Sequence, residues 1–470
     1  MSLTSTSQSD LTTTSLRPSR ESGARAADPR PARRGPLTRI VAASLVTGAV
    51  AAAVLVLGVF AGASEPVTTG IALVCLAAGW AMLAVLSTRM TSSPQRWAYG
   101  LAAFLGASGL ALISLTPGDD ALTAAAWLWP PMLLVLVTWS ERRMRAAMPG
   151  RTKWLLYPLL GALSLSCVGA LVEDVAAHRD VNATALPGHL YDVGGHRLYL
   201  SCTGTGAPTV VLESGLGGNS PSWTPVSAAT AGTTRVCAYD PAGIGASDDA
   251  TRPQDSNAVV GDLHRLLAAA GEAGPYVLVG HSVGGVYAMT YAARYPDQVA
   301  GMVLLDSASP RQFTVLPDYA MQYSMMTRLY GVLPTLARLG IGRFVPGLTA
   351  TEVPGNAGKQ ASIIANSPRS ASTSRDQLST YRRSFVQAQA LTTLGSKPLV
   401  VVSASDNLTE TAGWPAAQEQ LAALSSNVDR RTITSSHAGL LDHPGSFEGS
   451  VTAISDVVRA VRTGTAVGRP

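Results

Sequence analysis

The segment Gly280-His281-Ser282-Val283-Gly284 places a serine between two glycines, after the apolar run Tyr276–Val279 and before a predicted helix over 284–295. A serine on such a sharp turn from strand to helix holds its hydroxyl clear of the backbone, and the glycines let neighbouring chain pack closely. The start of the helix offers free N–H groups and a positive dipole end to a developing oxyanion. The pattern therefore predicts that Ser282 is a nucleophile.

A serine nucleophile needs a base, and the base needs an acid that orients it. His437 is the best candidate for the base, because it follows the predicted strand Arg431–Thr434 in a loop of small residues. The other six histidines lie in a linker, at a strand start, in a helix, beside the serine with the side chain turned away, or in a polar stretch before a proline: His178, His189, His196, His264, His281 and His443.

Two aspartates qualify as the acid in the chain order Ser-Asp-His. Asp306 ends the predicted strand Gly301–Leu305, whereas Asp406 follows the predicted strand Pro398–Val402 through a longer turn. We favour Asp406, because the longer turn can reach the loop of His437. Asp306 is the alternative acid; its competing interpretation is a strand-end residue that caps the entry to the next segment.

An oxyanion hole needs two N–H groups aimed at one point. The backbone of Val283, next to the nucleophile, supplies one candidate. The glycine-rich segment 214–218 follows the predicted strand Thr209–Glu213 and lets the backbone approach closely, so the Leu216 N–H is the second candidate.

The elements that must position these residues lie between residues 185 and 465. Short apolar runs there alternate with helical patterns, which predicts a mostly parallel sheet with helices on both faces. The predicted strands are His196–Cys202, Thr209–Glu213, Arg235–Tyr239, Tyr276–Val279, Gly301–Leu305, Pro398–Val402 and Arg431–Thr434. About 90 residues lie between Asp306 and Lys397, too many for a loop, so we expect a helical cap over about 307–396.

The first third of the chain has the composition of a membrane protein. Residues 1–38 are rich in Ser, Thr, Arg and Pro and predict a disordered tail. Five apolar stretches follow, each long enough to cross a bilayer core about 30 Å thick. They are Ile40–Ala63, Val67–Leu86, Trp97–Leu115, Ala121–Trp139 and Trp154–Leu171. We expect a transmembrane domain of five helices over 39–176, with a kink at Pro130 and Pro131.

The charges between these stretches predict an orientation. Arginines lie in the tail and in the segments 87–96 and 140–153, while 64–66 and 116–120 carry only acids. Because basic loops stay cytoplasmic, residues 1–38 are predicted inside and residues 185–470 outside. The chain has 32 Arg and three Lys, which together with its many alanines suggests a GC-rich bacterial genome and hence a bacterial cytoplasmic membrane.

Composition excludes several classes of protein. Charged residues are 14% of the chain against about 25% in soluble domains, which argues against a wholly soluble protein. The net charge of +5 does not indicate nucleic-acid binding, because residues 154–470 carry 21 basic and 23 acidic residues. Only four cysteines occur, and no CxxC or Cys/His cluster predicts zinc. No metal and no cofactor are predicted.

From about residue 185 the chain resembles the α/β-hydrolase family. The matching segments are 213–218 (ESGLGG), 239–247 (YDPAGIGAS), 280–285 (GHSVGG), 304–306 (LLD), Asp406 and His437. The resemblance implies a sheet of about eight strands, a Ser-Asp-His triad and a cap after the sixth strand. Many members have His-Gly where this chain has Ser214-Gly215. A serine in place of aspartate at position 282 argues against the epoxide hydrolases and haloalkane dehalogenases of the family.

The family's strand order would make the strands of Cys202 and Cys237 neighbours in the sheet. Facing positions on adjacent strands can approach disulfide distance, and the predicted outside compartment is oxidising. We expect a disulfide between them; the alternative is two buried thiols.

Two functions from different classes fit the sequence. The first is a membrane-anchored serine hydrolase that cleaves a small-molecule carboxylic ester; thioesterase, amidase and acyltransferase chemistry use the same triad. Apolar cap residues are compatible with an acyl chain or with ordinary packing: Tyr319, Met321, Tyr323, Met325 and Met326. The second is a membrane sensor or interaction protein that keeps the fold as a binding module. The intact order of Ser, Asp and His favours the enzyme. The lipid bilayer is the other expected partner, and no feature predicts an oligomeric state.

Overall fold

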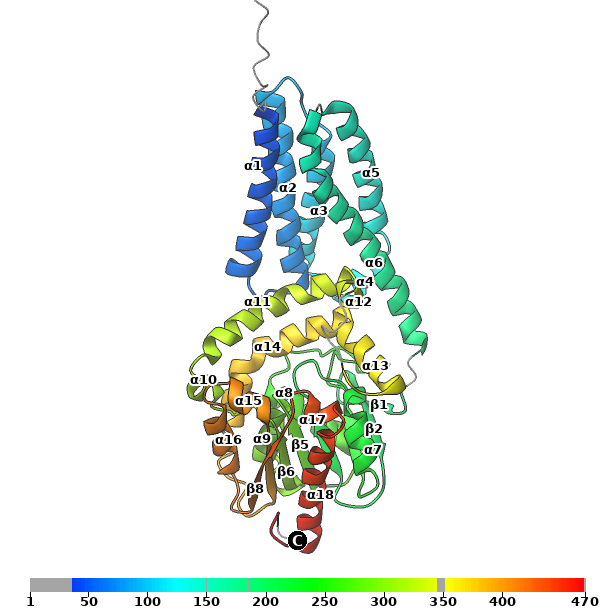
Figure 1. The fold of residues 1–470 in the computed structure, drawn as a ribbon. Helices are drawn as coiled ribbons and strands as arrows, with labels where there is room; N and C mark the ends of the chain where they lie inside the picture. Colours follow the sequence, from blue (N-terminus) through cyan, green and yellow to red (C-terminus); the bar gives the residue numbers. More distant parts are fainter. Residues whose placement is uncertain (1–35, 149, 184–185, 345–350, 469–470) are drawn as a thin grey trace, which may run out of the picture.

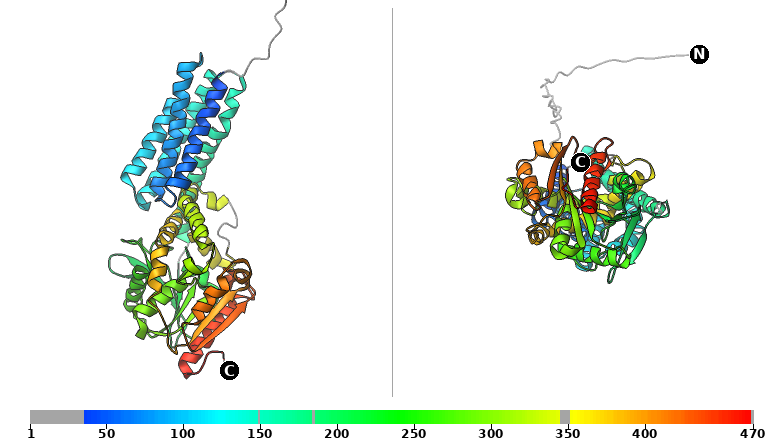
Figure 2. Two further views of the ribbon diagram at one scale, coloured as in Figure 1. Left: turned by 90° about the vertical axis from the view of Figure 1, so that its left-hand side faces the viewer. Right: turned by 90° about the horizontal axis from the view of Figure 1, so that it is seen from below.

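A computed structural model describes residues 36–148, 150–183, 186–344 and 351–468. An elongated helical bundle stands on a rounded α/β domain, and a layer of helices lies between them (Figures 1 and 2). Most of the predicted N-terminal tail lies outside the described residues.

The bundle contains the helices α1 (Pro36–Val54), α2 (Glu65–Met90), α3 (Ala98–Leu115), α4 (Asp119–Ala126), α5 (Trp129–Ala147) and α6 (Tyr157–Ala183). Among the described residues four helical segments are long and apolar enough to cross a membrane, and a fifth is obtained if α4 and α5 count as one span. These two helices meet at a bend of 42°. Pro130 and Pro131 follow the bend in the first turn of α5, where a missing N–H costs no helical hydrogen bond. The expected kink is therefore found just before the prolines.

Glycines let the first three helices approach closely. A Cβ atom on Gly70 would lie 2.7 Å from the carbonyl oxygen of Gly109, and a Cβ atom on Gly109 would lie 2.6 Å from that of Gly70. Gly48 and Gly79 form a similar contact between α1 and α2, where an added Cβ would lie 3.3 Å from the opposite Cα in each direction. Small residues of this kind are typical of helix packing in membranes, where tight backbone contact replaces the hydrophobic driving force.

The α/β domain contains one sheet of eight strands in the order β1-β2-β4-β3-β5-β6-β7-β8. The strands are β1 (His189–Asp192), β2 (Arg197–Thr203), β3 (Val210–Glu213), β4 (Val236–Tyr239), β5 (Tyr276–His281), β6 (Val299–Leu305), β7 (Leu399–Ala404) and β8 (Val428–Ile433). Among the described strands the pairs β1–β2 and β2–β4 are antiparallel and all other pairs are parallel, so β2 alone runs opposite to the rest. The fold class expected from the alternating pattern is confirmed. Strand β1 had no apolar signal of its own, and His189 lies in it and not in a linker.

Helices cover both faces of the sheet, as its continuous apolar strands require. Side chains of α8 (Ser256–Ala269) and α9 (Gly284–Arg294) form one core with the sheet. Those of α7 (Thr224–Thr230) and α18 (Phe447–Thr463) form the other. The central strand β5 is buried along its whole length between the two layers.

The segment between β6 and β7 forms the cap, which is helical in its described parts. Its helices are α10 (Gln312–Val315), α11 (Tyr319–Arg338), α12 (Ile341–Phe344), α13 (Gly355–Asn366) and α14 (Pro368–Ala388). Two cap arginines attach it to the bundle. Arg338 pairs with Glu65 at 2.6 Å and Asp119 at 2.7 Å, and Arg343 pairs with Glu173 at 2.5 Å and Asp180 at 2.8 Å. Partly buried charges are stable only when paired in this way.

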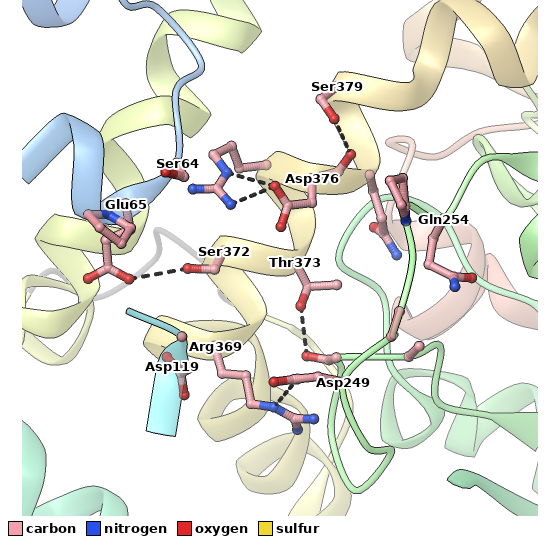
Figure 3. A pocket seen from close by; sticks show the side chains of 18 of the residues that line it. Ser64, Glu65, Asp119, Asp249, Gln254, Arg369, Ser372, Thr373, Asp376 and Ser379 are labelled. Carbon is pink, nitrogen blue, oxygen red and sulfur yellow. Dashed lines mark hydrogen bonds and ion pairs between the residues drawn. The ribbon is translucent and has the colours of Figure 1, made fainter. Parts of the chain in front are cut away.

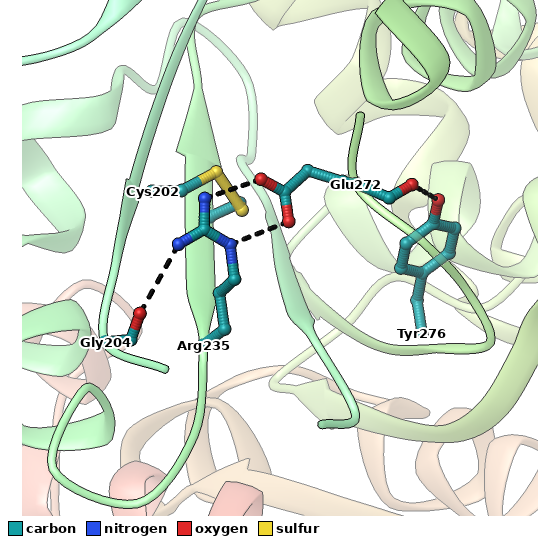
Figure 4. The surroundings of a disulfide bond; sticks show 6 residues. Cys202, Gly204, Arg235, Glu272 and Tyr276 are labelled. Atoms are coloured by element: carbon teal, nitrogen blue, oxygen red, sulfur yellow. Dashed lines mark hydrogen bonds and ion pairs between the residues drawn. A yellow bond between two sulfur atoms is a disulfide. The ribbon is translucent and has the colours of Figure 1, made fainter. Parts of the chain in front are cut away.

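A disulfide joins Cys202 of β2 to Cys237 of β4, as expected from the resemblance (Figure 4). The two residues are direct partners in the antiparallel register, and their Cα atoms lie 4.0 Å apart. Beside it, Arg235 makes two bonds to Glu272, at 2.6 and 2.8 Å. This corner of the sheet is therefore held by a covalent bond and an ion pair.

Glu213, at the end of β3, is a fully buried carboxyl in the core below the glycine-rich loop. The hydroxyl of Tyr239 donates to its Oε2 at 2.8 Å, whereas no described residue reaches Oε1. Burial raises the pKa of Glu213 to about 7, against the smaller lowering effect of the Tyr239 bond. The folded chain therefore holds this proton more tightly than the unfolded chain does.

We expect Glu213→Gln to remove a pH dependence of stability. In the wild type this carboxyl destabilises the fold as pH rises from the unfolded pKa of about 4.5 through the folded value of about 7. The free energy of unfolding lost over this pH range is on the order of 3 kcal/mol. The apparent melting temperature of the full chain in detergent should fall less in the variant than in the wild type between about pH 5 and about pH 8. The exposed Glu419→Gln serves as control; an equal fall in all three proteins would contradict the assignment.

Candidate active site

Ser282 lies on the turn between β5 and α9, as predicted. Its φ angle is +57°, in the left-handed region that a non-glycine residue rarely adopts. A Cβ atom on Gly284 would lie 2.2 Å from the carbonyl oxygen of Glu213, and one on Gly280 would lie 2.5 Å from Gly285 Cα. The strained serine is thus possible only because glycines flank it, and its side chain is half-buried at the head of α9.

His437 lies in the loop after β8, and its Nδ1 is 2.6 Å from Oδ2 of Asp306. Its side chain is 37% exposed. The Nε2–H of His281 donates to the carbonyl oxygen of His437 at 2.9 Å, and the two rings lie 4.4 Å apart. Since His281 precedes Ser282, this contact places the His437 loop beside the nucleophile.

His281 itself is an unsuitable base. Burial, followed by the nearby charge of His437, lowers its pKa to about 3. It therefore stays neutral and acts as a support for the His437 loop.

The prediction that Asp406 is the residue in contact with His437 is wrong. The chain after β7 turns at once into α15 (Ser405–Glu410), and Asp406 in its first turn accepts from the Ser405 hydroxyl at 3.1 Å. The loop after β8 instead crosses to the end of β6, where Asp306 has a φ angle of +42°. That conformation turns its carboxylate toward His437, so the alternative acid is the one in contact with the base.

Asp306 is completely buried, and four donors reach its two oxygens. Oδ1 accepts from the Ala404 N–H at 3.1 Å and the Trp414 indole at 2.8 Å, and Oδ2 accepts from Asn407 at 2.5 Å and from His437. Burial alone raises the pKa of this carboxyl, but the bond and charge of His437 and the other donors outweigh it, so the pKa is lowered. The group therefore remains a carboxylate.

The two candidate oxyanion donors are free to act. In the described parts of the chain no acceptor receives the backbone N–H of Val283 or of Leu216. The glycine-rich loop passes close to the nucleophile, because a Cβ atom on Gly215 would lie 2.9 Å from Ser282 Cβ. Gly217, in the same loop, donates its N–H to Oε1 of the buried Gln377 at 3.1 Å.

Helix α14 of the cap therefore touches the glycine-rich loop on one side, and on another it touches the bundle. Ser372 donates to Glu65 of α2 at 3.3 Å, and Thr373 donates to the carbonyl of Gly243 at 3.0 Å (Figure 3). Between them lies a cavity of about 560 Å³, whose wall includes these residues, Gln377 and the segment 249–254. No sequence spacing links residues so far apart, and Gln377 was not predicted.

The remaining histidines have other partners. His196 lies 3.3 Å from Asp262 in the core, His264 stacks on Tyr295 with 4.2 Å between ring centroids, and the exposed His443 pairs with Glu352 of the cap.

One group of described residues has ligand atoms close enough for a metal: Cys202, Cys237 and Glu272. The two sulfur atoms are joined in the disulfide, and Glu272 is paired with Arg235. This donor set does not fit a metal ion, since the sulfurs are not thiolates.

Comparison with known proteins identifies the α/β domain. The chain is 30% identical over 205 residues to an uncharacterized protein of Schizosaccharomyces pombe, which covers 43% of this chain and 36% of that protein. It is 39% identical over 98 residues to a putative carbamate hydrolase, RutD, of Escherichia coli, which covers 21% of this chain and 36% of that protein. The chain thus spans about a third of the length of these relatives. Among solved structures, the Cif epoxide hydrolase from Acinetobacter nosocomialis has a TM-score of 0.50 at 14% identity over 62% of this chain and 96% of that chain, a likeness of fold alone.

The sequence model of the α/β-hydrolase fold matches residues 208–444, half of the chain. That segment includes the turn of Ser282, the strand end at Asp306 and the loop of His437. The chain belongs to the α/β-hydrolase fold family.

Proposed function

We propose that the chain is a membrane-anchored serine hydrolase that cleaves a carboxylic ester. The observation that carries this proposal is the 2.6 Å bond between Asp306 and His437, in a loop packed beside the turn that presents Ser282. Aspartate, histidine and serine in this relation form the arrangement of a nucleophilic hydrolase. In this chain the three residues follow three different strands.

In the proposed reaction, Oγ of Ser282 attacks the ester carbonyl while Nε2 of His437 takes the hydroxyl proton. Asp306 holds the Nδ1–H and stabilises the imidazolium that forms. The N–H groups of Val283 and Leu216 bind the oxyanion of the tetrahedral intermediate. When the intermediate collapses, His437 gives its proton to the departing alcohol and leaves an acyl-serine. Water, deprotonated by His437, then releases the acid and restores the serine.

The five apolar stretches and the disulfide support a location outside a cytoplasmic membrane for the catalytic domain. The basic segments at 89–96 and 142–153 lie at the end of the bundle away from the α/β domain, and the acidic ends of α2 and α4 lie next to it. A disulfide persists in oxidising compartments. The apolar cap residues do not define the acyl group, because Tyr319, Tyr323 and Met326 pack into cores while Met321 and Met325 are exposed.

Ser282→Ala should abolish turnover of p-nitrophenyl esters and covalent labelling by a fluorophosphonate, by at least about 10³-fold. The reason is that the alcohol oxygen that forms the acyl-enzyme is gone. Turnover by the purified full chain in detergent and labelling on a gel measure the two effects. His443→Ala, which changes an exposed histidine on the neighbouring helix turn, should retain activity. Full labelling of Ser282→Ala would show that another residue is the nucleophile, whereas a wild type with neither labelling nor turnover would favour a binding module over an enzyme.

Asp306→Asn should lower kcat for ester hydrolysis by about 10⁴, since loss of the orienting carboxylate had this effect in a serine protease. The amide is isosteric but presents an N–H to His437 Nδ1 and cannot stabilise the imidazolium. Asp406→Asn is the matched control and should keep most of the wild-type rate. Apparent melting temperatures show whether both variants are folded. Loss of activity in Asp406→Asn alone would return the role of the acid to that residue.

An alkaline phosphatase fused after residue 468 should be active in a bacterial host, because we place the α/β domain outside. The same enzyme inserted in the segment 142–151 should be silent, since basic loops remain in the cytoplasm. Phosphatase activity of intact cells, corrected for the amount of fusion protein, measures both. The opposite pattern would contradict the orientation and leave the catalytic proposal untouched.

A further inference from the structure

Cap helix α11 carries a row of exposed apolar side chains, which we name the α11 stripe: Met321, Met325 and Leu329. They are 60%, 61% and 55% exposed. Residues four apart lie one above the other on a helix, so the three form a continuous strip and not scattered surface positions. An apolar strip of this kind on a soluble surface marks a site of interaction.

The opposite side of α11 packs against α14 and, with it, onto the core of the α/β domain. Tyr323, Met326 and Tyr330 contact its core, and Tyr323 donates its hydroxyl to the carbonyl of Leu378 at 3.1 Å. At 100° per residue this row lies about 130° around the helix from the α11 stripe. The stripe therefore points away from the catalytic domain.

A third side of α11 contacts the end of the bundle. Arg328 donates to the carbonyl of Leu57 at 3.0 Å, and a Cβ atom on Gly331 would lie 2.8 Å from the backbone nitrogen of Gly62. The bundle surface at this contact is apolar and exposed: Leu57, Val59 and Phe60 are 43%, 66% and 42% exposed. Figure 1 shows α11 lying across the end of α1, with its N-terminal half extending beyond the bundle.

We propose that the α11 stripe lies in the membrane leaflet next to the α/β domain, with lipid acyl chains as its occupant. The inference rests on the proposed membrane anchoring. Its basis is continuity: the stripe ends at Leu329, next to Arg328, which contacts the exposed apolar end of the bundle, and the core-packed row of α11 lies on the other side of the helix. Arg328 donates its Nε–H to Leu57, and the terminal N–H groups of this exposed side chain can bind lipid phosphates while its stem stays with the stripe. The cap would then sit as an interfacial helix and offer the active site to membrane-resident esters.

The test places an environment-sensitive fluorophore on the stripe. The label NBD is attached to Met325→Cys in a Cys75→Ala, Cys167→Ala background, which keeps the disulfide. The full chain is then reconstituted in phosphatidylcholine–phosphatidylglycerol nanodiscs, with or without doxyl-labelled lipid. We expect blue-shifted emission and doxyl quenching about threefold or more above that of Thr463→Cys. Thr463 is exposed at the far end of α18.

Val50→Cys, on the exposed side of α1, is the control for anchoring. If Val50 is quenched and Met325 behaves like Thr463, the stripe is in water and the inference is wrong while the anchoring stands. If Val50 is also unquenched, the membrane anchoring fails and the inference with it. A blue shift at Met325 that depends on protein concentration and not on doxyl lipid would indicate a second copy of the chain and overturn the lipid assignment. Because no arm uses turnover, the result is independent of hydrolytic activity.

Discussion

The completely buried carboxylate of Asp306 is the constraint around which the candidate site is arranged. An isolated charge in such a place costs several kcal/mol, so every lone pair must find a donor. The donors come from the backbone at the end of β7, from α15, from α16 (Trp414–Ala422) and from the loop after β8. Satisfying this one group therefore fixes the position of the His437 loop relative to three neighbouring strand ends. The orientation of the His437 ring follows from the need to solvate a charge in the core.

Local patterns predicted the parts of this arrangement that local chemistry determines. The apolar runs gave seven of the eight strands, and the glycines around Ser282 gave the turn, because both depend on residues next to each other in the sequence. The acid could not be chosen in this way. Asp306 and Asp406 both follow strands, and what separates them is a left-handed backbone conformation at one and an immediate helix at the other. The roles of Gln377 and Trp414 could not be predicted from local patterns either, because their hydrogen-bond partners lie more than 100 residues away in the sequence.

The N-terminal helical bundle shows the same division. Length and hydropathy predicted five stretches, and the structure has four long apolar helices with a fifth made of two pieces. The contacts between this region and the cap could not be read from composition. Arg338 and Arg343 look like ordinary helix-end charges in the sequence, yet each pairs with two carboxylates of the bundle. They make the cap a layer shared by the two regions.

Within this shared layer, helix α14 connects the bundle to the glycine-rich loop. Ser372 holds the end of α2, and Gln377, five residues later, holds the oxyanion loop. Five residues span only about 7.5 Å of helix axis, a length over which an α-helix behaves as a rigid rod. A shift of α2 that keeps both hydrogen bonds would therefore displace Gly217 as well. The position of the bundle is thereby linked through one helix to the position of the glycine-rich loop beside Ser282.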